Sequence, residues 1–301
     1  MCDLTNPIFS DEAAAMAHME ADRWPDEVTC PLCGVVGQNT KMKGNTQAGM
    51  FLCNACRGKF SVRTGTIFER SHIPLHKWLA ATHLMAASKK GISAHQLHRL
   101  LGITYKSAWF MAMRVREAMK PSGGEGPLGG PDKVVEADEL YTGKKAGITK
   151  KRGGSAHKCT VVSLVERGGR ARSFHIDRPD VVTLSGLVDA NVADGTRLHT
   201  DETNLFGRAK RPAKKEKVNH SRKEYARGDV TTNSVEGYFS VFERAVVGTF
   251  QHVSEQHLKR YLAEFDFRYN TRAKLGIEDA ERAHRILKGA EGKRLTYRQV
   301  G

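Results

Sequence analysis

The sequence predicts a mixed α/β protein whose sheet has strands of both directions, preceded by a small metal-binding module and a pair of helices. Four cysteines in two CxxC pairs lie near the amino end, and two short helical patterns follow them. After a stretch rich in glycine and proline, strand-like segments begin at Lys133. Three consecutive strands, then a helix and a further strand, favour a mixed sheet over a doubly wound parallel one.

Composition narrows the class of protein. The chain has 301 residues, enough for one sizeable core and one or two small modules. Lys and Arg outnumber Asp and Glu by 48 to 33, a net charge of +15 that favours a polyanionic partner such as nucleic acid. The alternative is a basic charge that only keeps the protein dissolved. No stretch has the pattern of a membrane helix or a signal peptide, so we expect a cytoplasmic protein.

The cysteine pairs predict a zinc site. In a reducing compartment, CxxC pairs at this separation bind metal more often than they form disulfides. Four thiolates complete a tetrahedron with no open position, so the ion should be structural Zn2+. Its ligands are Cys30, Cys33, Cys53 and Cys56. Strand-like pieces at residues 49–52 and 59–62 make the module a zinc ribbon, and Cys2 and Cys159 are left as plain thiols.

Residues 74–120 carry a helical pattern with short breaks. Ser93 can cap a helix over residues 94–101, and Thr104 can cap a second helix that ends at Met119. Two helices joined by such a turn are typical of a helix-turn-helix, whose second helix enters a major groove. The alternative is a helical hairpin that packs only on its neighbours. If the two helices form a helix-turn-helix, exposed side chains of the second helix would face DNA, namely those of Lys106, Ser107, Arg114 and Arg116.

The patterns divide the chain into six predicted segments. A linker rich in glycine and proline separates the helices from the α/β domain. The segments are an N-terminal helical extension (1–23, with a helix over 11–21 capped by Ser10), the zinc ribbon (24–70), the helix-turn-helix-like module (71–120), the linker (121–132), the α/β domain (133–275) and a C-terminal helix and tail (276–301).

The α/β domain has a clear predicted order of elements. Strands are predicted over residues 134–141, 159–166, 171–176 and 196–200, with a turn at Gly168-Gly169 and a helix over 181–192. A further helical region opens at Asn233. Its apolar stripe is expected to face the core: Leu258, Tyr261, Leu262, Phe265 and Tyr269.

Three acids stand where these elements begin or end. Asp138 ends the first strand, Asp201 follows the fourth, and Glu236 lies in the first turn of the helix that opens at Asn233. Carboxylate oxygens are the ligands that Mg2+ prefers. Two such ions about 4 Å apart can activate one oxygen and stabilise another during attack at phosphorus. The order of elements resembles the RNase H-like arrangement, in which the first and fourth strands are neighbours, so Asp138 and Asp201 are expected to lie close together.

Each aspartate is followed by a glutamate, Glu139 and Glu202. Adjacent side chains on a strand point to opposite faces, so only one of each pair is expected to face the metal. We choose Asp138 and Asp201 because a shorter side chain holds an ion more rigidly. Any single acid could be an ordinary surface residue, but the three together, with basic segments beside them, favour a site.

Two basic segments follow the two aspartates. Residues 207–228 carry nine Lys or Arg against two Glu, and residues 141–158 carry six against no acid. Charge runs are usually solvated faces, but a phosphodiester backbone that approached the metal would meet both segments first. The candidate DNA contacts, with those of the helix pair, are Lys106, Arg114, Lys144, Lys145, Lys151, Arg152, Lys210, Arg211, Lys214 and Lys215.

Several motifs occur in a specific order: CPLCG, FLCNAC, a helix pair, VVEADELYTGKK, LHTDE and NSVEGYFSVFERAVVGTFQHVSEQHLKRYLAEFDFRYNTR. In this order they resemble the insertion-sequence DDE transposases that carry an N-terminal zinc ribbon, from about Cys30 to Arg272. The resemblance implies an RNase H-like catalytic domain. Its metal ligands would be Asp138, Asp201 and Glu236.

The resemblance also bears on residues near the third acid. Family members often have a basic pair after the glutamate-bearing turn, where this chain has Glu243-Arg244. Arg244 is therefore the expected basic contact with the transposon end. Some members rely on asparagine in the third position, which makes Asn233 the reserve candidate.

The function implied by the resemblance is that of a DNA transposase of a bacterial insertion sequence, associated with the nucleoid. It would bind double-stranded DNA at terminal inverted repeats as a dimer or larger assembly. It would cut and join strands with Mg2+ or Mn2+ held by the three acids. Two alternatives stay open: a non-catalytic regulator that binds DNA through the zinc ribbon and the helix pair, and a metal-dependent nuclease that does not join strands.

Overall fold

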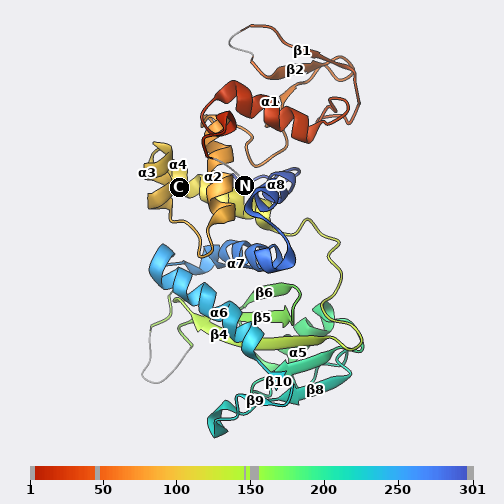
Figure 1. Ribbon diagram of the computed structural model, residues 1–301, viewed down its shortest axis with the longest axis vertical. Helices are drawn as coiled ribbons and strands as arrows, with labels where there is room; N and C mark the ends of the chain where they lie inside the picture. The colour runs from red at the N-terminus through yellow and green to blue at the C-terminus, as the bar shows by residue number, and fades with distance from the viewer. Residues whose placement is uncertain (1–3, 45–47, 146, 150–155, 297–301) are drawn as a thin grey trace. The chain divides into compact units, whose positions relative to one another are not determined.

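The computed structural model describes residues 4–44, 48–145, 147–149 and 156–296 (Figure 1). The chain divides into two compact units, Met1–Lys120 with Gly276–Gly301, and Pro121–Leu275. In the described residues, the first unit holds a small three-stranded sheet and several helices, and the second holds a five-stranded sheet covered by helices. No helix in the described part of the chain is both long and apolar enough to cross a membrane.

The small sheet of the first unit is antiparallel, in the order β1 (Asn39–Lys41), β2 (Met50–Cys53) and β3 (Lys59–Ser61). β2 and β3 confirm the two strands predicted for the ribbon, with each end within one residue. β1 carries polar side chains and so lacks the apolar alternation that predicts a strand. The sheet buries Phe51 against Phe60, with 5.5 Å between the ring centroids, and Trp24 packs edge-on against both rings.

The first long helix, α1 (Glu12–Arg23), is capped by Asp11 and not by Ser10, so that part of the prediction is wrong. The backbone N–H of Ala14 donates to Asp11 Oδ1 at 2.7 Å. Ser10 instead ends the preceding 3-10 helix η1 (Pro7–Phe9) through its own backbone N–H. Both residue types cap helices well, and the turn ahead of the helix places the aspartate at its start.

The other helices of the first unit are α2 (Leu75–Ala87), α3 (Ala94–Leu101), α4 (Tyr105–Met119) and α8 (Asp279–Lys288), the last of which packs against α2 and α4. The two predicted caps are confirmed. Ser93 forms a capping box with Gln96, and the backbone N–H of Ser107 donates to Thr104 Oγ1 at 3.2 Å. Between α3 and α4, Gly102 adopts a φ of 58°, a left-handed conformation that glycine permits at little cost.

The expectation that Arg114 and Arg116 face solvent is wrong. Arg114 is only 7% exposed, and its guanidinium donates to the backbone oxygens of Ile67 and Glu69 at 2.8 and 3.0 Å. Arg116 is also buried. α4 packs against α2, α3 and α8, so neighbours cover most of its surface. We therefore withdraw Arg114 as a DNA contact, because its charge is used to satisfy buried carbonyl groups.

The large sheet of the second unit runs in the order β6-β5-β4-β7-β8 over the residues described. Its strands are β4 (Val134–Thr142), β5 (Cys159–Glu166), β6 (Ala171–Ile176), β7 (Arg197–Thr200) and β8 (Lys214–Lys217). β4, β5 and β6 are antiparallel to one another in turn, whereas β4, β7 and β8 run parallel. The prediction of a mixed sheet is confirmed, and the four predicted strands are all present.

β8 is a strand that the sequence pattern does not predict, because all its residues are charged. It lies at the edge of the sheet, where one side of a strand meets solvent and charged side chains are tolerated. Glu216 anchors it, since Arg197 Nη2 on β7 donates to Glu216 Oε2 at 2.8 Å. Part of the basic segment 207–228 is therefore ordered as sheet.

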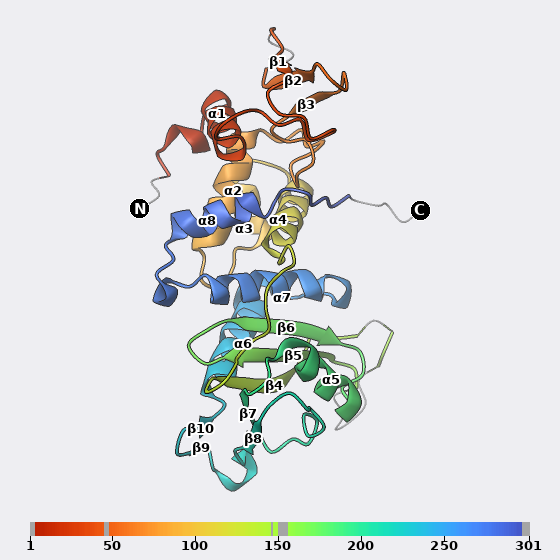
Figure 2. The ribbon, with the colours of Figure 1, turned by 90° about the vertical axis from the view of Figure 1, so that its right-hand side faces the viewer.

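The two faces of the large sheet are covered by different helices (Figure 2). α5 (Val181–Asn191) covers one face, where Leu184 and Val188 pack with Val135 and Leu198. α6 (Asn233–Ala245) and α7 (Glu255–Asn270) lie on the other. Four residues of the predicted stripe on α7 are buried, namely Leu258, Tyr261, Leu262 and Phe265. Short elements complete the unit: η3 (His220–Arg222), β9 (Ala226–Arg227), β10 (Val230–Thr231), the π-helix η4 (Val246–Phe250) and η5 (Ala273–Leu275).

Candidate functional site

The four cysteines of the ribbon converge as predicted. One ligand atom from each of Cys30, Cys33, Cys53 and Cys56 lies within 4.8 Å of all the others. The Sγ atoms of Cys30 and Cys56 are 3.9 Å apart, and those of Cys33 and Cys53 are 3.7 Å apart. These separations suit four thiolates around one tetrahedral zinc ion. The cluster sits beside the aromatic core of the small sheet, so metal binding and folding of the ribbon are coupled.

The second candidate centre forms beside the middle of β4 and just after the end of β7. The expectation that Asp138 ends its strand is wrong, because β4 continues to Thr142 while it pairs with β5. These strands are parallel neighbours, and their register pairs Glu136 with His199. Two residues further along, Asp138 and Asp201 therefore lie side by side. Carboxylate oxygens of Asp138, Asp201 and Glu139 all lie within 4.8 Å of one another. The structure thus brings together two of the three predicted acids.

The expectation that Glu139 turns away from this cluster is wrong. The backbone N–H of Glu139 donates to Asp138 Oδ1 at 2.7 Å, so the aspartate carboxylate lies against the backbone of the next residue. The longer Glu139 side chain then reaches the same space. For the second pair the expectation holds, because Glu202 lies outside the cluster and accepts from the backbone N–H of His220 at 2.9 Å. Strict alternation predicts where a Cβ points, but not where a flexible carboxylate ends.

The acidic cluster carries unfavourable charge in the absence of a cation. Burial, and then the charge of Asp201, raise the pKa of Asp138 to about 7. Burial, Asp201 and Asp138 likewise raise the pKa of Glu139 to about 7. Glu139 Oε2 is also buried without a hydrogen-bond partner among the described residues. Carboxylates that repel one another, with one buried oxygen left without a donor, are a ligand set that a hard divalent cation would satisfy.

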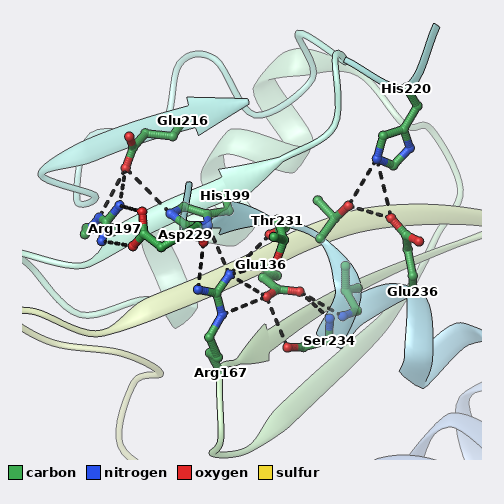
Figure 3. Close-up of polar contacts among 12 residues, drawn as sticks. Glu136, Arg167, Arg197, His199, Glu216, His220, Asp229, Thr231, Ser234 and Glu236 are labelled. Carbon is green, nitrogen blue, oxygen red and sulfur yellow. Dashed lines mark hydrogen bonds and ion pairs between the residues drawn. The ribbon is translucent and has the colours of Figure 1, made fainter. Parts of the chain in front are cut away.

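Glu236 lies beside the cluster but outside the group of oxygens within 4.8 Å. Its charge contributes to the raised pKa of Asp138. Thr232 Oγ1 donates to Glu236 Oε1 at 2.5 Å, and His220 Nε2 is 3.5 Å from the same oxygen (Figure 3). The side chain is exposed, so it is held by two contacts and not by packing. The reserve candidate Asn233 is an exposed residue at the first position of α6.

A buried glutamate that sequence reasoning missed fixes the start of α6. Glu136 is fully buried on β4, and its Oε2 accepts from the backbone N–H groups of Ser234 and Val235 at 2.6 and 3.1 Å (Figure 3). Its Oε1 accepts from Arg167 Nη2 at 2.9 Å. A carboxylate at a helix N-terminus satisfies free N–H groups and complements the helix dipole. In the sequence, the only sign of this role is that Glu136 is a charged residue inside the otherwise apolar strand segment VVEA.

The same network extends to the far edge of the sheet (Figure 3). Arg167 Nη2 lies 3.3 Å from His199 Nδ1, and because Arg can only donate, this nitrogen of His199 accepts. Arg197 pairs with both Glu216 and Asp229, at 2.8 and 2.6 Å. The network therefore ties β4, β7, β8 and the start of α6 together, and Glu236 stands on the helix that it anchors.

The predicted DNA contacts divide into exposed cations and cations used within the fold. Exposed residues are Lys106, Lys144, Lys210, Arg211, Lys214, Lys215 and Arg244, and some of these also make contacts within the fold. Arg211 lies 3.4 Å from Asp194, and Lys214 pairs with Glu216 at 2.8 Å. Lys145 Nζ donates to the backbone oxygen of Asp177 at 2.9 Å. Lys215 Nζ donates to the backbone oxygens of Gly207 and Ala209 at 2.7 and 3.0 Å. Lys151 and Arg152 lie outside the described residues.

Two family models match the chain. Residues 127–270 match the ISXO2-like transposase domain, and residues 10–59 match the transposase zinc-ribbon domain. Over 299 residues, the chain is 29% identical to an uncharacterized protein in the transposable element ISH50 of Halobacterium salinarum, covering 90% of this chain and 95% of that protein. Among solved structures, the chain is similar to one from the simian T-cell lymphotropic virus intasome in complex with PP2A regulatory subunit B56 gamma. The two are 14% identical, and the matched region covers 56% of this chain and 63% of the other. The TM-score of 0.28 is too low to support an argument.

Proposed function

The chain belongs to the insertion-sequence transposases of the IS1595 family, and on that premise we propose that it cuts and joins DNA at the terminal inverted repeats of its element, using Mg2+ or Mn2+. The observation that carries the proposal is the convergence of Asp138, within β4, and Asp201, directly after the neighbouring parallel strand β7. Rigid strands hold these carboxylates, which is what a catalytic metal site requires.

The donor set fits magnesium. It consists of carboxylate oxygens only, and burial together with the negative charge of Asp201 raises the pKa of Asp138. In this proposal Asp138, Asp201 and Glu236 hold the ions, and Glu139 is close enough to replace one of them. Bound magnesium would lower the pKa of a water and offset charge on the leaving oxygen. Glu136 positions Glu236 by anchoring the first turn of α6.

We also propose a fold for the second unit, a role for α3 and α4, and a set of domain boundaries. The second unit is proposed to be RNase H-like, supported by β4 and β7 as parallel neighbours that both lead to acids. α3 and α4 are proposed to act as a helix-turn-helix, with Lys106 at the exposed start of α4. The predicted segments 1–23, 24–70, 71–120, 121–132, 133–275 and 276–301 are proposed as the domain organisation.

DNA binding is proposed to use exposed cations of the second unit. Lys144 follows β4, Lys210 and Arg211 follow Asp201 in the chain, and Arg244 lies exposed on α6. Contacts of this kind go to phosphates, so binding should weaken steeply with salt. Because two transposon ends must be cut together, a dimer or larger assembly on DNA is part of the proposal.

A nicking and joining assay tests the proposal. Full-length protein with Mg2+ should nick a duplex that carries the inverted repeat, and Asp138→Asn should lower the rate by about a hundredfold or more while leaving binding intact. Normal nicking by Asp138→Asn would show that the assigned site is wrong. Binding without any metal-dependent nicking would favour a regulator. Nicking that never leads to joining, when pre-cut ends and a plasmid target are supplied, would favour a nuclease.

A further inference from the structure

A third cluster of metal-binding side chains lies in the second unit, apart from both centres described above. It consists of Cys159 at the first position of β5, His175 near the end of β6 and Glu255 at the first position of α7. One ligand atom from each lies within 4.8 Å of the other two. His175 Nε2 and Glu255 Oε1 are 3.9 Å apart.

The register of the sheet explains why these residues meet. β5 and β6 are antiparallel, and Val161 stands opposite His175. Cys159 is two residues from Val161, so it shares a face with His175. Phe174 and Ile176 pack into the core on the α5 side, so His175 between them points to the face covered by α6 and α7. α7 packs against β6 and begins with Glu255.

Two members of the cluster have buried side chains, Glu255 is half-buried, and one ligand atom is unsatisfied. Cys159 is 1% exposed, and the side chain of His175 is 6% exposed. His175 Nε2 is buried without a hydrogen-bond partner in the described part of the chain, although the thiol and the carboxylate are both close to it. A buried ring nitrogen without a partner is costly and calls for an explanation. A metal ion between the three side chains would supply its missing partner.

We propose that Cys159, His175 and Glu255 bind a second zinc ion, distinct from the four-cysteine ion and from the proposed magnesium site. Thiolate, imidazole and carboxylate are the zinc ligands found in proteins, and a thiolate disfavours magnesium. Three protein ligands leave one position for water. On binding, the Cys159 thiol loses its proton to solvent and a sulfur–zinc bond forms. The ion ties the start of α7 to β5 and β6.

Metal stoichiometry tests the proposal. Full-length protein is equilibrated with Zn2+ in excess Mg2+, dialysed against metal-free buffer, and analysed for zinc per chain. The wild type should retain two zinc ions, and Cys159→Ser and His175→Asn should each retain one. His252→Asn, at an exposed histidine, is the matched control and should retain two. The ribbon zinc that remains in the variants reports that the ribbon of the first unit is folded, and an unchanged circular dichroism spectrum reports that the second unit is folded as well.

Two further measurements separate this site from the others. Asp138→Asn should still retain two zinc ions, so failure of the magnesium proposal leaves this one standing. Cadmium-substituted wild type should give two cadmium NMR resonances, one typical of four thiolates and one of a mixed sulfur, nitrogen and oxygen site. The second resonance should be lost in Cys159→Ser. One zinc ion in the wild type, or two in both Cys159→Ser and His175→Asn, would overturn the proposal.

Discussion

The four-cysteine cluster and the acidic cluster are built in opposite ways. The cysteines come from two short knuckles in one small sheet, and their sulfur atoms form a closed set of four. The acids come from the middle of β4 and from the residue after β7, and β5, β6 and α5 separate these two strands in sequence. Spacing along the chain is therefore enough to predict the four-cysteine cluster. The acidic cluster depends on the register between strands, which the whole sheet sets.

The electrostatics of the two centres differ as well. The cysteines provide a complete tetrahedron for zinc, whereas the acids leave Glu236 outside the group and bring in Glu139 instead. Mutual repulsion and burial hold the pKa of Asp138 and of Glu139 at about 7. We infer that the cysteine centre serves stability and that the acidic centre stores unfavourable charge that a divalent cation relieves.

The largest expected effect is on the ribbon. Cys53→Ser should lose the ribbon zinc and unfold residues 24–70, because metal binding supplies on the order of 10 kcal/mol to modules of this size. Zinc content and limited proteolysis measure the loss. Cys2→Ser is the control and should behave like the wild type. A Cys53→Ser protein that kept its zinc and resisted protease would contradict the local construction of this centre.

The next effect concerns Glu136, the residue that couples α6 to the sheet. Glu136→Gln should lower the free energy of unfolding by about 3 kcal/mol, because it leaves Arg167 without its buried partner. Chemical denaturation measures the change, and hydrogen exchange should increase most at Ser234 and Val235. Glu243→Gln, on the exposed side of the same helix, should change stability by less than about 0.5 kcal/mol. Equal effects of the two substitutions would refute the anchoring role.

A third prediction addresses catalysis at the acidic centre. Asp201→Asn should slow strand cleavage by about a hundredfold or more, which is about 2.7 kcal/mol of transition-state stabilisation. Since the charge of Asp201 raises the pKa of Asp138, the same substitution should lower that pKa in an NMR titration. Glu202→Gln, next in the chain but outside the cluster, should cleave within about tenfold of the wild-type rate. A normal rate for Asp201→Asn would remove this residue from the site.

The last prediction concerns the pH dependence of stability without metal. A carboxyl group whose pKa is raised from 3.8 to about 7 binds its proton more tightly in the folded protein than in the unfolded chain. Asp138 therefore stabilises the fold fully below its unfolded pKa, and this contribution is lost as the pH rises through about 7. The difference in unfolding free energy between wild type and Asp138→Asn should change by up to about 4 kcal/mol between about pH 4 and pH 8, since each unit of pKa shift is worth about 1.4 kcal/mol. A difference that is flat with pH would rule out the raised pKa.

The sequence predicted most of the scaffold because the signals are short-range. Ser93 and Thr104 cap their helices through N–H groups within three residues, and the strands that became β4 to β7 have apolar runs of their own. The exceptions have a shared cause. β8 has no apolar pattern, and Arg114 is buried by helices that lie far from it in sequence, so neither could be recognised locally.

By itself, the sequence determined the cysteine centre, the caps at Ser93 and Thr104, the mixed sheet and the placing of Asp201 directly after a strand, since each depends on spacing or on patterns along a single segment. Only the tertiary structure decided that Glu139 joins these acids, that Glu136 holds the start of α6, and that Cys159 meets His175 and Glu255. These contacts are set by strand register and by helices that pack across a sheet. The physical reason is that side chains distant in sequence are brought together only when the whole core has formed.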